Sequence, residues 1–225
     1  MNTSSSTAST ESPSTRQKAT VVREYGPFPV ERVHGVTHDG THVWFAHGTK
    51  KIAAMNPETG AIEKEIEVSA EAGTAFDGEH LYQIGEDKIW KVDPKTGRVV
   101  ATLAAPGVTK DNSGLTWEGG TLWVGQYKGR AIHQIDATTG EVQKTLRSDR
   151  FVTGVSFVDG DLWHGTWEED TTELRRVDSD TGRVLETLEM PAGGVSGLEA
   201  KGDLFFCGGG GKTPVVRAVK RPSRT

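Results

Sequence analysis

The sequence predicts an all-β fold, a five-bladed β-propeller, and two series of glycines carry this prediction. One glycine ends a polar turn in each of four repeats, at intervals of roughly 40 residues, as Gly60, Gly97, Gly140 and Gly182. Another opens each of five repeats, in step with the first series, as Gly35, Gly73, Gly114, Gly154 and Gly197. Between these glycines lie short apolar or alternating runs, which are typical of strands. Repeats of this length that are built from short strands indicate propeller blades.

The chain begins with a Ser/Thr-rich segment, residues 1–19, which we expect to be a disordered arm. One strand candidate, Val21–Tyr25, follows the arm and precedes the first repeat. The first four repeats then supply four strands each. We expect these strands at about 33–37, 42–46, 51–55 and 62–67, at 74–76, 80–84, 88–92 and 99–103, at 114–117, 121–126, 131–135 and 142–146, and at 154–157, 161–166, 173–177 and 184–188.

The fifth repeat is one strand short, because its candidates cover only 197–200, 203–207 and 215–219. Val21–Tyr25 is the natural fourth strand of this blade, so the start of the chain would close a ring of four-stranded antiparallel blades. Closure of this kind removes the exposed sheet edges that an open array would have. We therefore expect a single propeller domain over residues 20–220 and a short tail at 221–225.

The turn residues agree with this arrangement. Asp39-Gly40, Asp77-Gly78 and Asp159-Gly160 stand between the first and second strands of their repeats, where a tight hairpin needs positive φ. The Asp-x-x-Thr-Gly turns join the third and fourth strands. One of them, residues 178–182, resembles the beginning of a calcium loop, but the later bidentate glutamate is missing. We interpret it as a turn equivalent to those of the other repeats.

Composition narrows the possible partners of this chain. Its net charge of −5 and pI near 5.8 give no reason to expect nucleic acid or an acidic membrane surface as a partner. The single cysteine, Cys207, excludes an intramolecular disulfide, and we expect it to be a buried, unreactive thiol. No segment has the apolar length that a secretory signal or a membrane-spanning helix requires. We expect a cytoplasmic protein, whose oligomeric state the sequence does not indicate.

Candidate site residues are those that break the repeat, since the repeat itself is scaffold. We expect them at one end of the central channel, where the first strand of each repeat begins and the second strand ends; this end is here called the top mouth. We expect a small-molecule site there. Its candidate catalytic residues are His164, His47 and Glu168. Its candidate substrate-binding residues are His34, Gln83, Asp111, Asn112, Gln126, Tyr127, Lys128 and Trp167.

Histidine suits either general-base chemistry or metal ligation. His34, His47 and His164 could converge on a divalent metal, although no short-range histidine pair supports this cofactor. Each could equally be a rim histidine bonded to a loop carbonyl. Glu199 stands in a column of first-strand residues that is otherwise Thr, Ala or Ser, so it either faces the channel as a functional group or is a solvated carboxylate.

The run Gly-Val-Thr-x-Asp-Gly-x-x-Val-Trp-Phe and the turn Asn-Pro-Glu-Thr-Gly resemble two related propeller groups. These are the five-bladed glutamine cyclotransferases (glutaminyl cyclases) and, more distantly, the seven-bladed streptogramin B (virginiamycin B) lyase group. Val33 to Thr37 falls where the cyclases have Phe-Thr-Gln-Gly-Leu. Val43 to Gly48 falls where they carry Glu-Ser-Thr-Gly, whose carboxylate moves the proton, and this chain has no glutamate there.

Two functions from different classes follow. The first is an enzyme, a lyase or cyclotransferase-like protein, that abstracts a proton from a small substrate and drives elimination or cyclisation. His164 or His47 would be the base, and Trp167 and Tyr127 would form substrate walls. The second is a non-catalytic propeller that binds a peptide or partner protein on its top face, with the same two aromatics as anchors.

Overall fold

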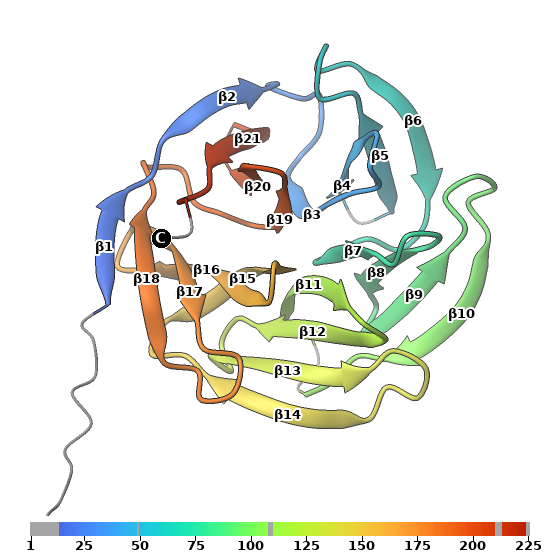
Figure 1. Ribbon diagram of the computed structural model, residues 1–225. Coiled ribbons are helices and arrows are strands. Elements are labelled where there is room, and N and C mark those ends of the chain that lie inside the picture. Colours follow the sequence, from blue (N-terminus) through green and yellow to red (C-terminus); the bar gives the residue numbers. More distant parts are fainter. Residues whose placement is uncertain (1–13, 49, 108–109, 210–212, 224–225) are drawn as a thin grey trace, which may run out of the picture.

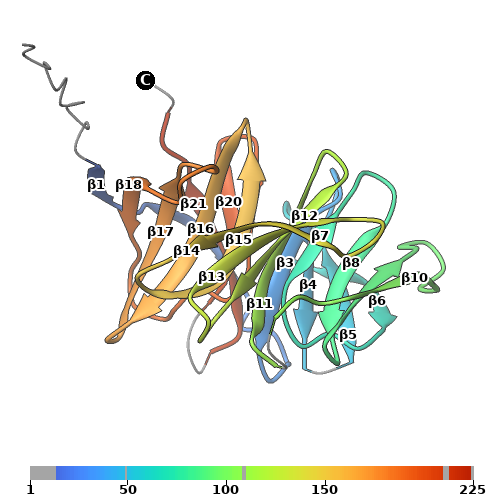
Figure 2. The same ribbon diagram turned by 90° about the horizontal axis from the view of Figure 1, so that it is seen from below.

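The computed structural model describes residues 14–48, 50–107, 110–209 and 213–223. Their strands form five sheets arranged as blades around a central axis (Figure 1). The predicted five-bladed β-propeller is thereby confirmed. Figure 2 shows the ring from the side, with inner strands such as β3 and β11 running along the axis. The described residues include no helix long and apolar enough to cross a membrane.

The blades follow one another along the chain. Blade 1 contains β3 (Val33–His38), β4 (Val43–His47), β5 (Lys51–Met55) and β6 (Ile62–Glu67). Blade 2 contains β7 (Thr74–Phe76), β8 (Leu81–Gly85), β9 (Lys88–Val92) and β10 (Val99–Ala104). Blade 3 contains β11 (Asn112–Glu118), β12 (Thr121–Gln126), β13 (Ala131–Asp136) and β14 (Val142–Arg147). Blade 4 contains β15 (Phe151–Val158), β16 (Asp161–Glu168), β17 (Thr171–Val177) and β18 (Val184–Glu189). Blade 5 contains β19 (Leu198–Lys201), β20 (Leu204–Gly209) and β21 (Val215–Lys220).

The ring closes as the sequence predicts. The strand β2 (Val21–Tyr25) pairs antiparallel with β21 and completes blade 5, with Tyr25 opposite Val216. This pairing joins the beginning of the propeller to its end.

A further strand, β1 (Thr15–Lys18), lies within the range expected to be a disordered arm. It pairs in parallel with β18 and extends blade 4 to five strands. Arg16 reaches the buried Glu173 at 2.7 Å, and Gln17 donates to Glu186 at 3.1 Å, so β1 is held by polar contacts to a distant part of the chain. The rest of the expected arm, residues 1–13, lies outside the described residues, as do residues 224–225 of the expected tail.

The opening glycines pack the inner strands against one another. A Cβ atom at Gly35 would lie 2.4 Å from the backbone nitrogen of Thr74 in the next blade, and one at Gly197 would lie 2.4 Å from that of Val36. Such distances are shorter than real Cβ contacts allow. Only glycine permits this approach, which explains why the repeat is anchored on this residue.

Large rings on the second strands fill the space between blades. Trp44, Tyr82, Trp123 and Trp163 are buried opposite equivalent residues of the first strands. In blade 5 the pairing places Phe206 opposite Glu199, as Trp44 stands opposite Thr37. Phe206, and not its neighbour Phe205, therefore occupies the repeated aromatic position, because Glu199 and Phe206 have the same spacing along the chain as Thr37 and Trp44.

Candidate functional site

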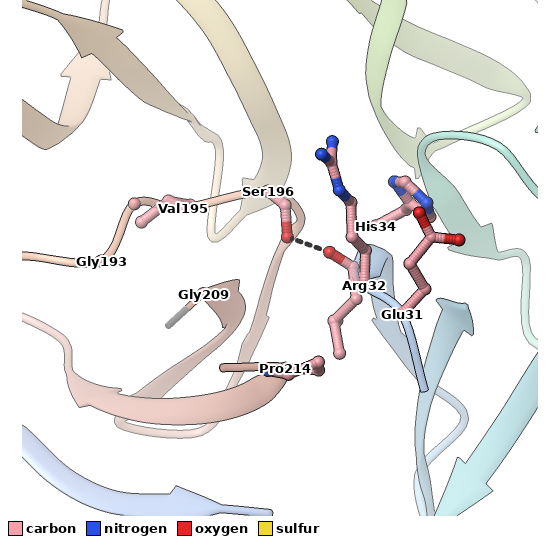
Figure 3. A pocket seen from close by; sticks show the side chains of 10 residues that line it. Glu31, Arg32, His34, Gly193, Val195, Ser196, Gly209 and Pro214 are labelled. Atoms are coloured by element: carbon pink, nitrogen blue, oxygen red, sulfur yellow. Dashed lines mark hydrogen bonds between the residues drawn. The ribbon is translucent and has the colours of Figure 1, made fainter. Parts of the chain in front are cut away.

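A cavity of about 610 Å³ opens at the top mouth. One wall comes from the entry to blade 1 and consists of Glu31, Arg32, Val33 and His34; the opposite wall comes from blade 5 and consists of Gly193, Gly194, Val195, Ser196, Gly209 and Pro214. Figure 3 shows Val195 and Ser196 on one side and the side chains of Arg32, His34 and Glu31 on the other. The Ser196 hydroxyl donates to the Val33 carbonyl at 2.6 Å, which fixes one wall to the other.

A second cavity of about 240 Å³ lies beside the first. Its lining comes from blades 1, 2 and 3 and consists of His34, Glu71, Ala72, Ile84, Asp87, Lys110 and Asn112. Lys110 has a φ of 58°, and its backbone nitrogen donates to the Asp87 carboxylate at 2.6 Å. The side-chain oxygen of Asn112 is buried without a hydrogen-bond partner among the described residues. This pocket thus contains acidic groups, one ammonium and one unused amide oxygen.

His34 lies in the walls of both cavities. Burial lowers the pKa of its imidazole, and the positive charge of Arg32 lowers it further. At neutral pH the ring is therefore uncharged and can accept a proton. Both cavities bring a carboxylate and a cation near this imidazole, namely Glu31 and Arg32 in the larger and Glu71 and Lys110 in the smaller. A neutral imidazole in such surroundings suits proton transfer within a bound polar molecule.

His164 lies elsewhere. It belongs to β16, is 2 % exposed and packs between blades 3 and 4, near Arg175. Burial lowers the pKa of His164 to about 4, and its Nδ1 lies 3.3 Å from the Gly165 carbonyl. It does not line either cavity.

His47 is also held within its own blade. Its Nε2 lies 3.1 Å from the Glu65 carboxylate, and Lys51 binds the other oxygen of that carboxylate at 3.0 Å. Burial lowers the pKa of His47, while the charge of Glu65 opposes this effect. The two histidines expected to be catalytic are thus separated from each other and from the cavity that His34 lines.

Glu168 belongs to an aromatic and ionic cluster over blades 3 and 4. Its carboxylate binds Arg130 at 2.8 Å, and the Arg130 guanidinium lies 4.4 Å from the centroid of the Phe151 ring. Tyr127 stacks on Phe151 at 4.7 Å, and Trp167 stacks at 6.4 Å from it. Burial, with the nearby charge of Glu168, raises the pKa of Tyr127. These partly exposed rings form one preformed surface, hereafter the Tyr127–Trp167 cluster.

Several expected binding residues instead stabilise the scaffold. Gln83 is fully buried, accepts from Thr74 at 2.6 Å and donates to the carbonyls of Ala72 and Ile84. Gln126 donates to the Pro106 carbonyl at 3.1 Å.

Asp111 has a supporting role beside the smaller cavity. Its carboxylate accepts the backbone N–H groups of Lys128 and Gly129, each at 2.7 Å. This clamp holds the segment that presents Lys110 and Asn112 to the cavity. The Lys128 side chain itself is exposed.

Glu199 faces the propeller axis below the ring of opening glycines. Thr37 and Ser156, from blades 1 and 4, donate to its two carboxylate oxygens at 2.9 and 3.3 Å. The backbone nitrogen of Ala200 donates at 2.9 Å. Burial nevertheless raises the pKa of Glu199 to about 7, because these three hydrogen bonds offset only part of the lost hydration.

The described residues offer no group of three or more His, Cys, Asp and Glu side chains placed to hold a metal ion. In particular, His34, His47 and His164 do not converge. The donor set therefore does not fit the expected divalent metal. Cys207 is buried and unpaired, and burial raises its pKa to about 12.

Five charged residues of the cavities are not among the predicted site residues: Glu31, Arg32, Glu71, Asp87 and Lys110. All of them except Asp87 precede an opening glycine by two to four residues, so the loops before these glycines carry a signal for the site. Asp87 lies in the turn between β8 and β9 and follows no such pattern.

No protein-family model matches the sequence, and comparison with curated proteins finds no match. Among solved structures, the chain is similar to a glutaminyl cyclase from Myxococcus xanthus, with a TM-score of 0.76 and 15% identity over 94% of this chain and 100% of that one. It is also similar to a hydrazine synthase from Kuenenia stuttgartiensis, with a TM-score of 0.52 and 18% identity over 81% of this chain. That match covers 56% of the hydrazine synthase chain. At these sequence identities the similarity shows a shared fold. The expected resemblance of this chain to the glutaminyl cyclases is thereby confirmed for the fold.

Proposed function

We propose that this chain is a cyclotransferase-like enzyme that acts on a small polar substrate at the top mouth, with His34 as the group that moves the proton. The observation that carries the proposal is the position of His34, whose imidazole lines both cavities and has a lowered pKa. A histidine that acts as a base must be unprotonated at the working pH and must reach the substrate. The lowered pKa of His34 and its position in the walls of both cavities support this role.

The chemistry can be written without an external reactant. In cyclisation of a glutaminyl substrate, the amine nitrogen attacks the side-chain amide carbon, one C–N bond forms, and the C–N bond to the departing ammonia breaks. His34 would accept the proton that the attacking amine loses and deliver it to the leaving nitrogen. Lys110, across the smaller cavity, would stabilise the negative charge that develops on the amide oxygen of the substrate. The unpartnered side-chain oxygen of Asn112 would accept an N–H group of the substrate.

This assignment replaces the carboxylate that moves the proton in the cyclases. The corresponding segment of this chain, Val43 to Gly48, has no glutamate, and His47 within it binds Glu65. Glu31 and Glu71 remain as acidic groups on either side of His34. They can hold the substrate amine in place while the imidazole carries the proton.

The test is release of ammonia from free glutamine and from peptides with an N-terminal glutamine, followed by mass spectrometry of the product. The His34→Gln variant should lower kcat by about 10²–10⁴-fold, the usual contribution of a positioned acid–base group. His133→Gln is the matched control, because His133 is also half-buried with a lowered pKa but lies on β13, away from both cavities. Full turnover by His34→Gln, or no ammonia from wild-type protein with any of these substrates, would refute the proposal.

A second function is favoured by the Tyr127–Trp167 cluster, which is preorganised and partly exposed. Aromatic side chains of this kind anchor peptides and partner proteins. A non-catalytic propeller would bind its partner through this cluster. The Trp167→Ala variant would then weaken partner binding, whereas the enzyme proposal predicts that it leaves ammonia release within a few-fold of wild type.

A further inference from the structure

The outer strand of a propeller blade presents a free edge, and most of these edges are protected in this chain. The strands β6, β14 and β2 carry charged side chains, among them Lys64, Lys144 and Arg23. The edge of β18 is covered by β1. Charges and covering strands are the usual means by which proteins prevent edge-to-edge pairing.

The edge of β10 has neither protection. Its sequence, Val-Val-Ala-Thr-Leu-Ala, contains no charged residue and no proline, and the sheet of blade 2 ends at this strand. Val99 and Val100 are 43% and 52% exposed, and they are two of the four large hydrophobic side chains exposed in the described part of the chain. Figure 1 places β10 on the outer rim of the ring.

Comparison with the sister blades shows how far β10 departs from the repeat. Lys64 of β6 donates to the carbonyls of Pro94 and Lys95 in the next blade at 2.6 and 2.8 Å. Lys144 of β14 likewise donates to the Ser179 carbonyl at 3.1 Å. Ala101 occupies the equivalent position in β10 and makes no such bond. A lysine here is therefore compatible with the fold, and its replacement by alanine removes a charge from an exposed edge.

We propose that β10 is a dimer interface, in which it pairs antiparallel with β10 of a second copy of this chain. A two-fold axis places no like charges opposite one another, because the strand carries none. Each chain offers one such edge, so the assembly closes at two copies and does not form a filament. The packing of β1 on β18 shows that an outer strand of this same propeller accepts a fifth strand.

The geometry of β10 sets the register and the strength of the contact. A bulge interrupts its pairing with β9 between Val99 and Ala101, so the regular edge runs from Ala101 to Ala104. The N–H group of Ala105 bonds back to Asp87, so along this edge Thr102 and Ala104 point their backbone groups outward. The two-fold axis therefore passes through Leu103 of both copies, with Thr102 opposite Ala104 of the second copy. An edge this short buries less area than a stable obligate interface, so we expect a dimer with a Kd in the micromolar range, roughly 1–100 μM.

The experiment is sedimentation velocity of the full chain from about 5 to 500 μM, a range that brackets the expected Kd. Wild-type protein should shift from monomer to dimer, and Ala101→Lys should raise the Kd at least tenfold. Val142→Lys is the matched control, because Val142 is 50% exposed on the charged strand β14. It should leave the Kd unchanged, and circular dichroism should show that both variants are folded.

Three results would overturn the proposal: a monomeric wild type over the whole range, an unchanged Kd for Ala101→Lys, or an equal loss of dimer in Val142→Lys. Association that continues beyond the dimer would also contradict it, since one edge per chain cannot build a longer assembly. Because β10 lies on the rim, Ala101→Lys should not alter ammonia release. The dimer and the proposed reaction can therefore fail independently.

Discussion

Replacing the axial carboxylate by an amide, Glu199→Gln, should stabilise the protein at alkaline pH and leave its stability unchanged in acid. Burial raises the pKa of Glu199 from 4.5 to about 7 in the folded state. Below pH 4.5 the carboxyl is protonated in both the folded and unfolded chain, so it carries no penalty. As the pH rises from 4.5 to 7 the unfolded state ionises first, and stability is lost. Each pKa unit corresponds to about 1.4 kcal/mol, so the full penalty above pH 7 is about 3 kcal/mol.

The measurement is urea unfolding, followed by tryptophan fluorescence, at pH 4.5 and pH 8. The free energy of unfolding of Glu199→Gln should exceed that of wild type by about 2–3 kcal/mol at pH 8 and by less than about 0.5 kcal/mol at pH 4.5. Comparing variant with wild type at each pH cancels the titration of all other groups. The exposed Glu67→Gln serves as control and should show no difference at either pH. A variant that is less stable than wild type at pH 8, or equally stabilised at both pH values, would refute the reasoning.

Three further predictions concern the scaffold. Burial lowers the pKa of His164 from 6.5 to about 4, so the unfolded chain binds a proton at this residue before the folded chain does. The free energy of unfolding should therefore fall by up to about 3 kcal/mol as the pH decreases from 6.5 to about 4. His164→Gln should lack this loss when urea unfolding is compared at pH 7 and pH 4.5. Gly35→Ala should lower the free energy of unfolding by more than about 3 kcal/mol or prevent folding. In Gly40→Ala the new Cβ meets open space at a φ of 99°, so this variant should lower the free energy of unfolding by only about 1 kcal/mol. Thermal unfolding of both variants measures the difference. Arg16→Ala should release β1 from blade 4, since Arg16 binds Glu173 and Glu189, and should speed proteolytic cleavage before Val21 without altering the core; an unchanged cleavage rate would contradict this.

The site illustrates the limit of comparing repeats by sequence alone. His34, His47 and His164 all break the repeat, yet only His34 reaches a cavity. The other two lie on second strands, whose successive side chains point alternately toward the two neighbouring blades. Side chains at these positions lie in the interior between blades or bind partners such as Glu65. The stacking of the blades decides toward which neighbour each side chain points.

By itself, the sequence determined the propeller, the number of blades and the strand that closes the ring. These features depend on local patterns in the sequence. The turns need glycine, the inner strands tolerate no Cβ at Gly35 or Gly197, and short apolar runs lie between them. Tertiary structure decided the rest. The polar strand β1 exists because Glu173 and Glu189, far along the chain, bind Arg16. The cavity exists because loops of separate blades meet at the top mouth. The pKa values of His34 and Glu199 are shifted by burial among residues of several blades, which no local pattern encodes.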